Sequence, residues 1–334
     1  MSVIVKGKIN VPSLHQIGIA TKDIKDTAQN YCKILGIGPW TIVDAVPPDL
    51  HDHFYHGRKA DFEFGAAFAE VGEIEFELNE KTKGHTLYDD FIESYGEGVF
   101  HLQYLVNSVD LMERHVDIMS KNGFAPLMEG RFGIKGGFYY FDTVNELKTI
   151  WEVVKASDKI FGETHTYPDN YSDLPSNKLK TTQITQVGLV VNNLEEVMEN
   201  YCNILGIGPW DIYESVSEKH LFLDKNGNKH KLNIRTASAK VGDVYLELIQ
   251  PLSADNIYGR FLSKHGERIH HIEFLSDDIN KTIDTMEVNG ITTLYSGYYN
   301  GGGFAFFNTY KPLKIIFKAA QSPKNITLPT NRYP

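Results

Sequence analysis

The stretch HQIGIATKDIKDTAQNYCKILGIGPW at residues 15–40 returns as TQVGLVVNNLEEVMENYCNILGIGPW at residues 185–210. Residues 30–40 and 200–210 differ only where Lys33 is replaced by Asn203. The copies lie 170 residues apart (185 minus 15), whereas the repeats of solenoid proteins recur every 20–50 residues or so. The chain is therefore predicted to contain a duplicated domain, with two related copies of one site to compare.

The pattern around the first copy predicts the element order β-α-β-β-β. Residues 14–20 read as a strand, and Asp23 is a suitable N-cap for a helix whose apolar residues follow at helical spacing. Gly36 stands where a helix commonly ends in a left-handed residue. Further strands are predicted from Trp40, at 61–69 and at 74–78.

The same order recurs over residues 100–154, 185–250 and 269–318, which gives an α+β protein of four units paired into two domains. Residues 156–183 are polar and contain prolines, as is typical of a linker. We therefore predict one domain at residues 1–157, a linker at 158–182 and a second domain at 183–334. The tail from residue 321 is expected to be extended.

Composition excludes some classes of function. The net charge of −10 and the pI near 5.7 disfavour nucleic acids and anionic membranes as partners, because both call for a basic surface. Cys32 and Cys202 occupy equivalent positions and read as buried thiols of a reducing compartment. The N-terminus MSVIVKGKIN lacks a signal-peptide pattern and the chain has no long apolar run, so we expect a cytoplasmic protein.

Polar residues interrupt apolar strands at four positions of the first half: Gln16, Glu77, His101 and Glu152. Taken singly, each such residue more often faces solvent on the wet side of a sheet. The duplication raises the odds, because the offset of 170 leads to Gln186, Glu247 and His271. Two carboxylates, an imidazole and an amide oxygen form a suitable set for a divalent first-row metal.

The fourth position differs between the copies. Aligning GGFYYFDTVNELKTIWE with GGFAFFNTYKPLKIIFK places Lys318 opposite Glu152. A protonated lysine cannot ligate a metal, and it could pair with Glu247 instead. We therefore expect one complete metal site per chain and a degenerate site in the second domain.

These residues resemble the vicinal-oxygen-chelate (glyoxalase/bleomycin-resistance/dioxygenase) superfamily over residues 12–156 and 183–320. The segment PLSADNIYGRFLSKHGERIHHIEFLSDDI from Pro251 resembles the methylmalonyl-CoA epimerases, and the Gln/Glu/His/Glu set is similar to that of the lactoylglutathione lyases. The resemblance implies tandem domains, each of two paired βαβββ units that form a curled mixed sheet around a metal. It also implies a set of metal ligands, namely Gln16, Glu77, His101 and Glu152.

The activity that the resemblance implies is a metal-dependent epimerase, isomerase or lyase that removes a proton next to a carbonyl group. Glu152 is the first candidate for the catalytic base and Glu77 the second. The implied cofactor is a divalent ion (Zn, Co, Ni or Mn). The implied substrate is a small carbonyl compound, either an acyl-CoA or a 2-oxo compound, and a homodimer stays open.

Alternatives remain at this stage. A lactoylglutathione-lyase-like glyoxalase would need an arginine where the chain has Ala20, and an Fe(II) dioxygenase would need a histidine in place of Gln16. A metal-free ligand-binding or resistance protein is a further reading, which Lys318 suits. Pairing of units across domains would combine His101 and Glu152 with residues of the second half, namely Gln186 and Glu247.

His51, His53 and His56 in DLHDHFYHGRK resemble a metal cluster in composition. Their irregular spacing and expected loop position favour a solvent-exposed or substrate-covering loop.

Overall fold

The computed structural model describes residues 6–158, 164–171, 179–215, 221–224, 226–299, 301–322 and 328–334. The chain divides into two compact units. The first unit comprises Val11–Cys32 and Ile37–Leu174; the second comprises Met1–Asn10, Lys33–Gly36 and Pro175–Pro334. The predicted boundaries differ from this division, since the first ten residues are grouped with the second unit. Each unit contains one curled sheet, which confirms the predicted α+β fold.

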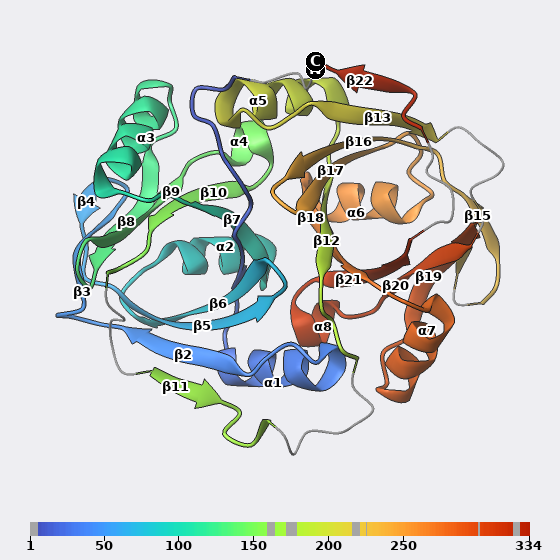
Figure 1. Ribbon diagram of the computed structural model, residues 1–334, viewed down its shortest axis with the longest axis horizontal. Helices are drawn as coiled ribbons and strands as arrows, with labels where there is room; N and C mark the ends of the chain where they lie inside the picture. Colours follow the sequence, from blue (N-terminus) through green and yellow to red (C-terminus); the bar gives the residue numbers. More distant parts are fainter. Residues whose placement is uncertain are drawn as a thin grey trace. The chain divides into compact units, whose positions relative to one another are not determined.

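The described residues of the first unit form an 11-stranded mixed sheet in the order β11-β2-β5-β6-β1-β7-β10-β9-β8-β3-β4 (Figure 1). The strands are β1 (Gln16–Ala20), β2 (Trp40–Ala45), β3 (Leu50–Tyr55), β4 (Arg58–Lys59), β5 (Glu63–Val71), β6 (Ile74–Lys83), β7 (Gly98–Leu105), β8 (Pro126–Phe132), β9 (Gly136–Phe141), β10 (Ile150–Lys155) and β11 (Thr164–Tyr167). The helices are α1 (Ile24–Leu35), α2 (Leu87–Tyr95), α3 (Val109–Lys121) and α4 (Val144–Leu147).

Two β-α-β-β-β halves meet at the centre of this sheet. One half supplies β2-β5-β6-β1 and the other supplies β7-β10-β9-β8, so the antiparallel pair β1 and β7 lies between them. Within each half the first and last strands are parallel, as β1 is to β6 and β7 is to β10. The two halves therefore bring four equivalent strands side by side, and these are the strands on which the four candidate ligands were predicted.

Helices cover the two faces of the sheet differently. On one face, Tyr31 of α1 packs against Phe76 of β6, with ring centroids 5.7 Å apart. On the opposite face, Tyr88 of α2 contacts Phe64 and Phe100 and fills one end of the curl. The remainder of that face stays open to a pocket.

The second unit repeats this plan in its described residues, with the order β15-β14-β19-β20-β21-β18-β12-β17-β16-β13-β22. Its strands are β12 (Ile184–Val190), β13 (Trp210–Ser215), β14 (Leu221–Asp224), β15 (Lys229–Lys231), β16 (Ile234–Val241), β17 (Val244–Pro251), β18 (Arg268–Leu275), β19 (Thr293–Tyr299), β20 (Gly302–Phe307), β21 (Ile316–Gln321) and β22 (Asn331–Tyr333). Its helices are α5 (Leu194–Leu205), α6 (Ile257–His265), α7 (Ile279–Val288) and α8 (Tyr310–Leu313). As predicted, Gly36 and Gly206 follow their helices with φ of 67° and 66°, a left-handed conformation that costs glycine little.

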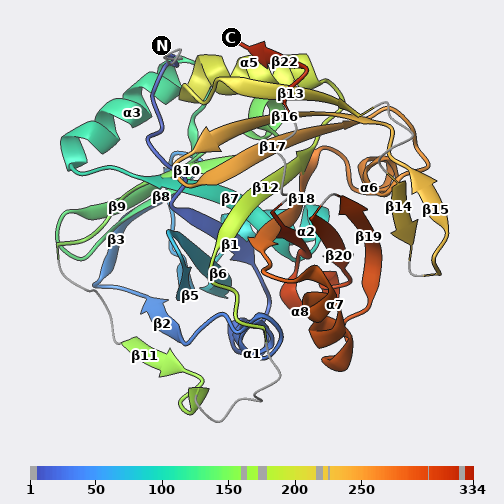
Figure 2. The same cartoon turned by 45° about the vertical axis from the view of Figure 1, so that its right-hand side comes forward.

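Each sheet gains a strand from a segment that was predicted to be linker or extended tail. β11 pairs with β2, with Tyr167 opposite Trp40, and β22 pairs with β13, with Tyr333 opposite Trp210. Figure 1 shows the first of these pairs and Figure 2 the second. An edge strand leaves backbone groups unpaired, and an added strand satisfies them. The two segments are themselves a repeat, since both end in Tyr-Pro.

None of the helices in the described part of the chain has the length and apolar character needed to cross a membrane. Both cysteines are buried thiols.

Candidate metal and substrate site

Four side chains predicted from the sequence converge on one face of the first sheet. Gln16 lies on β1, Glu77 on β6, His101 on β7 and Glu152 on β10, and all four are buried. The Nε2 atom of His101 lies 3.2 Å from Gln16 Oε1 and 3.2 Å from Glu152 Oε2. It lies 3.5 Å from Glu77 Oε2. We call these four residues the polar cluster.

Strand register explains why the polar cluster forms. Gly18 of β1 lies opposite Glu77 on one side and opposite His101 on the other, two residues beyond Gln16 and on the same face. A Cβ atom on Gly18 would lie 1.8 Å from Cε1 of His101, so only glycine leaves room for the imidazole ring. The second unit repeats the device, because a Cβ on Gly188 would lie 2.2 Å from Cε1 of His271.

The electrostatics of the polar cluster favour a bound cation. Burial raises the pKa of Glu77 to about 8; His101 partly offsets this effect and Glu152 adds to it. Burial also raises the pKa of Glu152 well above its ordinary value and lowers that of His101 to about 4. Glu77 Oε2, Glu152 Oε2 and His101 Nδ1 are buried without a hydrogen-bond partner. Buried carboxylates that face each other need protons or a cation, and this donor set fits a divalent metal.

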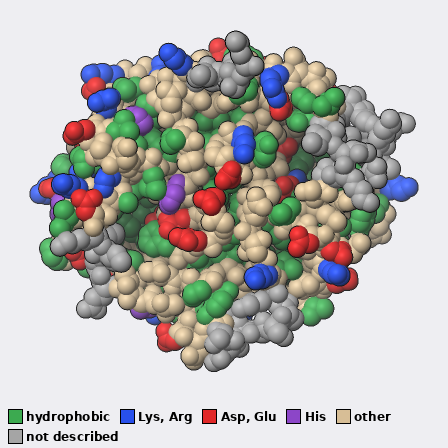
Figure 3. All heavy atoms as spheres, viewed as in Figure 1, with side chains coloured by type: hydrophobic (Ala, Val, Ile, Leu, Met, Phe, Trp, Pro, Cys, Tyr) green, Lys and Arg blue, Asp and Glu red, His purple; other side chains and the backbone are tan. Residues whose placement is uncertain are grey.

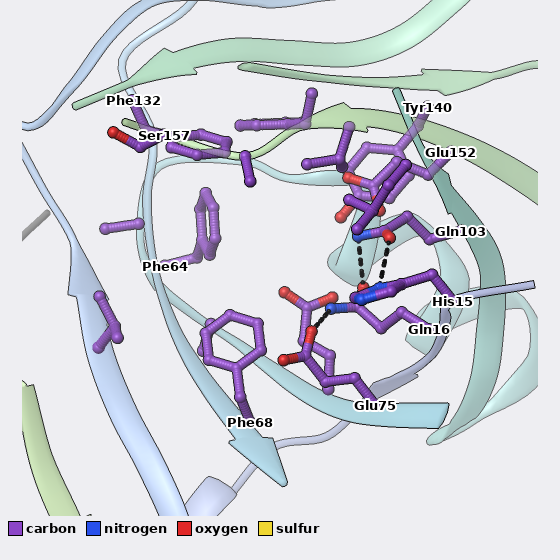
Figure 4. Close-up of a pocket in the computed structure, with 18 residues that line it drawn as sticks. His15, Gln16, Phe64, Phe68, Glu75, Gln103, Phe132, Tyr140, Glu152 and Ser157 are labelled. Atoms are coloured by element: carbon purple, nitrogen blue, oxygen red, sulfur yellow. Dashed lines mark hydrogen bonds between the residues drawn. The ribbon is translucent and has the colours of Figure 1, made fainter. Parts of the chain in front are cut away.

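Three further polar residues hold Gln16 in place, and sequence reasoning missed their role. Glu75 Oε1 accepts a hydrogen bond of 2.6 Å from Gln16 Nε2, and Gln103 Nε2 donates one of 3.1 Å to Gln16 Oε1 (Figure 4). The Nδ1 atom of His15 lies 3.2 Å from Gln103 Oε1. These contacts orient the amide so that its oxygen faces His101. The available signal was spacing, since Glu75 and Gln103 lie two residues from Glu77 and His101 and therefore share their face.

A pocket of about 450 Å³ opens beside the polar cluster. Its walls are mainly apolar, and of the residues that line it in the described part of the chain, none is lysine or arginine. Figure 4 shows Phe64, Phe68 and Phe132 around the space into which Glu75 and Glu152 also face. In the space-filling view, a hollow with hydrophobic walls and acidic side chains beside it opens over these strands (Figure 3).

The equivalent face of the second unit contains an ion pair. The Nζ atom of Lys318 lies 2.6 Å from Glu273 Oε2, and Thr185 Oγ1 donates a hydrogen bond of 2.6 Å to Glu273 Oε1. The expectation that Lys318 pairs with Glu247 is therefore corrected: its ion pair is with Glu273, its direct neighbour in register on β18. Burial alone would lower the pKa of Lys318, but Glu273 and then Glu247 more than offset it, so that this pKa is raised.

The pairing of halves also answers an alternative that the sequence left open. β1, β6, β7 and β10 belong to one sheet, so Gln16 and Glu77 share a face with His101 and Glu152. The other combination would take Gln186 and Glu247 from the second sheet.

The histidine-rich segment was predicted to be a loop, and this is wrong for two of its residues. His51 and His53 lie on β3, and His56 occupies the tight turn before β4 with a φ of 48°. Alternation along β3 points neighbouring residues to opposite faces, so they do not gather. Within the described residues, the group of His, Cys, Asp or Glu side chains that could hold a metal is Glu77, His101 and Glu152, whose ligand atoms lie within 4.8 Å of one another.

Comparisons with known proteins agree with this arrangement. A model of the Glyoxalase/Bleomycin resistance protein/Dioxygenase superfamily matches residues 15–141 and again residues 185–307. The "Uncharacterized protein YqjC" of Bacillus subtilis (strain 168) is 30% identical over 104 residues, which are 31% of this chain and 64% of that protein. The chain thus covers less than two thirds of this relative.

Among solved structures, a variant of 4-hydroxymandelate synthase from Streptomyces coelicolor aligns with a TM-score of 0.61 at 12% identity. The alignment covers 96% of this chain and 95% of that chain, and at this identity it shows a shared fold. Methylmalonyl-CoA epimerase from Streptomyces coelicolor is 22% identical, with a TM-score of 0.36, over 43% of this chain and 99% of that chain.

Proposed function

Because the chain belongs to the glyoxalase/bleomycin resistance protein/dioxygenase superfamily, we propose that its first unit is a divalent-metal-dependent enzyme that moves a proton next to a carbonyl group. The observation that carries this proposal is the convergence of Gln16 Oε1, Glu77 Oε2 and Glu152 Oε2 on His101 Nε2, within 3.5 Å. Two of these oxygens are buried without a hydrogen-bond partner. Such a cluster is costly unless a cation compensates it.

The proposed ligands are the four residues of the polar cluster: Gln16, Glu77, His101 and Glu152. A bound zinc, cobalt, nickel or manganese ion would act as a Lewis acid that polarises the carbonyl oxygen of the substrate. Glu77 and Glu152 together match the charge of such an ion, so that an incoming enolate-like charge faces no large excess of negative charge.

Glu152 is the proposed base. Its side chain lines the pocket, so it can reach a substrate carbon, and its neighbour in register on β9 is Tyr140. A carboxyl group whose pKa is raised by burial can both accept a proton and return it near neutral pH. Return of the proton to the same carbon from the other side, through Glu77, gives epimerisation; return to the adjacent carbon gives isomerisation.

The apolar walls support this chemistry by excluding water from the base and the carbonyl group. The finer assignments belong to the proposal: an epimerase or isomerase that resembles methylmalonyl-CoA epimerase, an acyl-CoA or 2-oxo substrate, and a cytoplasmic location. Homodimerisation is left open.

Metal analysis and a proton-exchange assay test the proposal together. We expect one divalent ion per chain, and solvent deuterium uptake by NMR in at least one member of a panel of acyl-CoA thioesters and 2-oxo compounds. Glu77→Gln should lose the metal, and Glu152→Gln should lose exchange. The matched control is Glu247→Gln, which alters the residue that corresponds to Glu77 in the second unit and should retain both properties. Exchange that survives full chelation, or equal effects of Glu77→Gln and Glu247→Gln on metal content, would contradict the proposal.

A further inference from the structure

The pocket beside the polar cluster has two facing apolar walls. One wall comes from β2 and β5, with Val43, Ala45, Phe64, Ala66 and Phe68. The other comes from β8, β9 and β10, with Phe132, Phe138, Tyr140 and Val154. The sheet therefore encloses a slot that is polar only at the end where the carboxylates lie.

Aromatic rings line this slot and small residues make its space. The rings of Phe64 and Phe138, which come from opposite walls, meet edge to face with centroids 6.0 Å apart. Phe138 in turn packs against Tyr140 at 5.6 Å. Ala45 and Ala66 stand on the first wall among these rings, where larger side chains would fill the cavity of about 450 Å³. Planar groups pack well against ring edges and faces of this kind.

The charges at the polar end limit the substrate in a second way. Glu75, Glu77 and Glu152 all line the pocket, and its described lining contains no lysine or arginine to balance them. A divalent cation would neutralise two of the three carboxylates. A substrate that brought two negative charges to this end would face repulsion from the third.

Resting on the function proposed above, we infer that the substrate is a carbonyl compound that places an aryl-sized apolar group between the two walls. It brings no more than one negative charge to the polar end. Phe68 is the residue that most directly links the two parts, because it lies opposite Glu77 in the register of β5 and β6. It therefore borders both the slot and the polar cluster.

The second unit offers a natural comparison for this inference. Ser238 lies opposite Glu247 just as Phe68 lies opposite Glu77, and Thr236 stands where the first unit has Ala66. Phe68→Ser therefore introduces a residue that the same strand position already accepts in this chain. The change removes the ring without overfilling the core.

Three probes test the inference on the metal-loaded full chain: pyruvate, phenylpyruvate and oxaloacetate. They share the 2-oxo carboxylate and differ only in the group that would enter the slot. By calorimetric titration we expect phenylpyruvate to bind at least about tenfold more tightly than pyruvate, because its ring leaves water. Oxaloacetate, a dianion, should bind no more tightly than pyruvate.

Two variants locate the preference in the slot. Phe68→Ser should reduce the preference for phenylpyruvate severalfold, and Ala66→Phe should abolish it by filling the space, with metal content unchanged in both. Val288→Ser, an exposed position in the second unit, is the control and should change nothing. Equal binding of phenylpyruvate and pyruvate, tightest binding of oxaloacetate, or a preference that survives both pocket variants would overturn the inference. A preference for phenylpyruvate that persists after chelation would support the apolar slot and contradict the metal-dependent function.

Discussion

Lys318 and Glu273 form an ion pair of 2.6 Å at the two positions where the first unit has Glu152 and Gln103. In both units these residues are direct neighbours on parallel strands, as shown by the register of Glu152 with Gln103 and of Lys318 with Glu273. A carboxylate and an amide in one copy thus correspond to an ammonium and a carboxylate in the other. The second copy satisfies its buried charges internally.

Exchanging this pair should create a second metal site. Lys318→Glu combined with Glu273→Gln would give the second unit the same four donor types as the first, together with Gln186, Glu247 and His271. We expect the metal content measured by elemental analysis to rise from one to two ions per chain. Lys318→Glu alone places two carboxylates side by side without a cation, and should lower the free energy of unfolding by about 3 kcal/mol. An unchanged metal content in the double variant would contradict the proposed ligand set.

The close approach of Gly18 and His101 predicts a specific effect of a single methyl group. In Gly18→Ala the added Cβ would lie 1.8 Å from Cε1 of the His101 ring, so the ring must move. Displacement of a proposed ligand should weaken metal binding by about 10–100-fold, as disturbed support of ligands does elsewhere. A competition titration with a metal indicator measures this.

Gly188→Ala is the control for that variant. Its added Cβ meets His271 in the same manner, at 2.2 Å, in the unit that is expected to hold no metal. Both variants should lose stability by about 1–3 kcal/mol through overpacking, while only Gly18→Ala should lose metal affinity. The same metal affinity in both variants would mean that His101 is not a ligand.

Removal of the metal should expose the cost of burying Glu77. Its pKa is about 8 in the folded protein, against about 4.3 when unfolded. Between these values the folded state retains a proton that the unfolded state has lost, so the contribution of Glu77 to the free energy of unfolding falls as pH rises. The slope is at most about 1.4 kcal/mol per pH unit, and the whole effect at most about 5 kcal/mol.

Glu77→Gln isolates this contribution, because the amide does not titrate. Denaturant unfolding in the presence of chelator, from pH 5 to pH 8, should show the variant gaining stability relative to the wild type as pH rises. His101 is present in both proteins, so its own titration largely cancels in the difference. A stability difference that stays constant across this range would show that Glu77 titrates normally in the folded state.

The positions of the four candidate ligands could be predicted because two independent signals coincided there. Gln16, Glu77 and His101 interrupt apolar strands, and the duplication repeats all three. Helix α3 was also predicted with its observed bounds, since apolar spacing and Gly123 define it locally. Signals that act within one strand or helix are thus legible in the sequence.

Features that depend on register between strands were not predicted. Glu75 and Gln103 seemed to be scattered polar residues until pairing with β1 placed them around Gln16. The partner of Lys318 was misassigned for the same reason, because Glu273 is its neighbour only through the alignment of β18 with β21. The strands β11 and β22 form because an edge is available, and their own sequences are short and polar.

The hydrogen bond from Gln103 Nε2 to Gln16 Oε1 predicts that Gln103 is a positioning residue for the metal. Gln103→Leu keeps the volume of the side chain but leaves the Gln16 amide held only by Glu75. Free rotation of the amide would turn its nitrogen toward His101 for part of the time, and a nitrogen that carries two protons cannot ligate. We expect about a tenfold loss of metal affinity. With saturating metal, proton exchange should recover, because Gln103 itself does not take the proton. Exchange that stays low when the metal site is full would instead place Gln103 among the residues that act on the substrate.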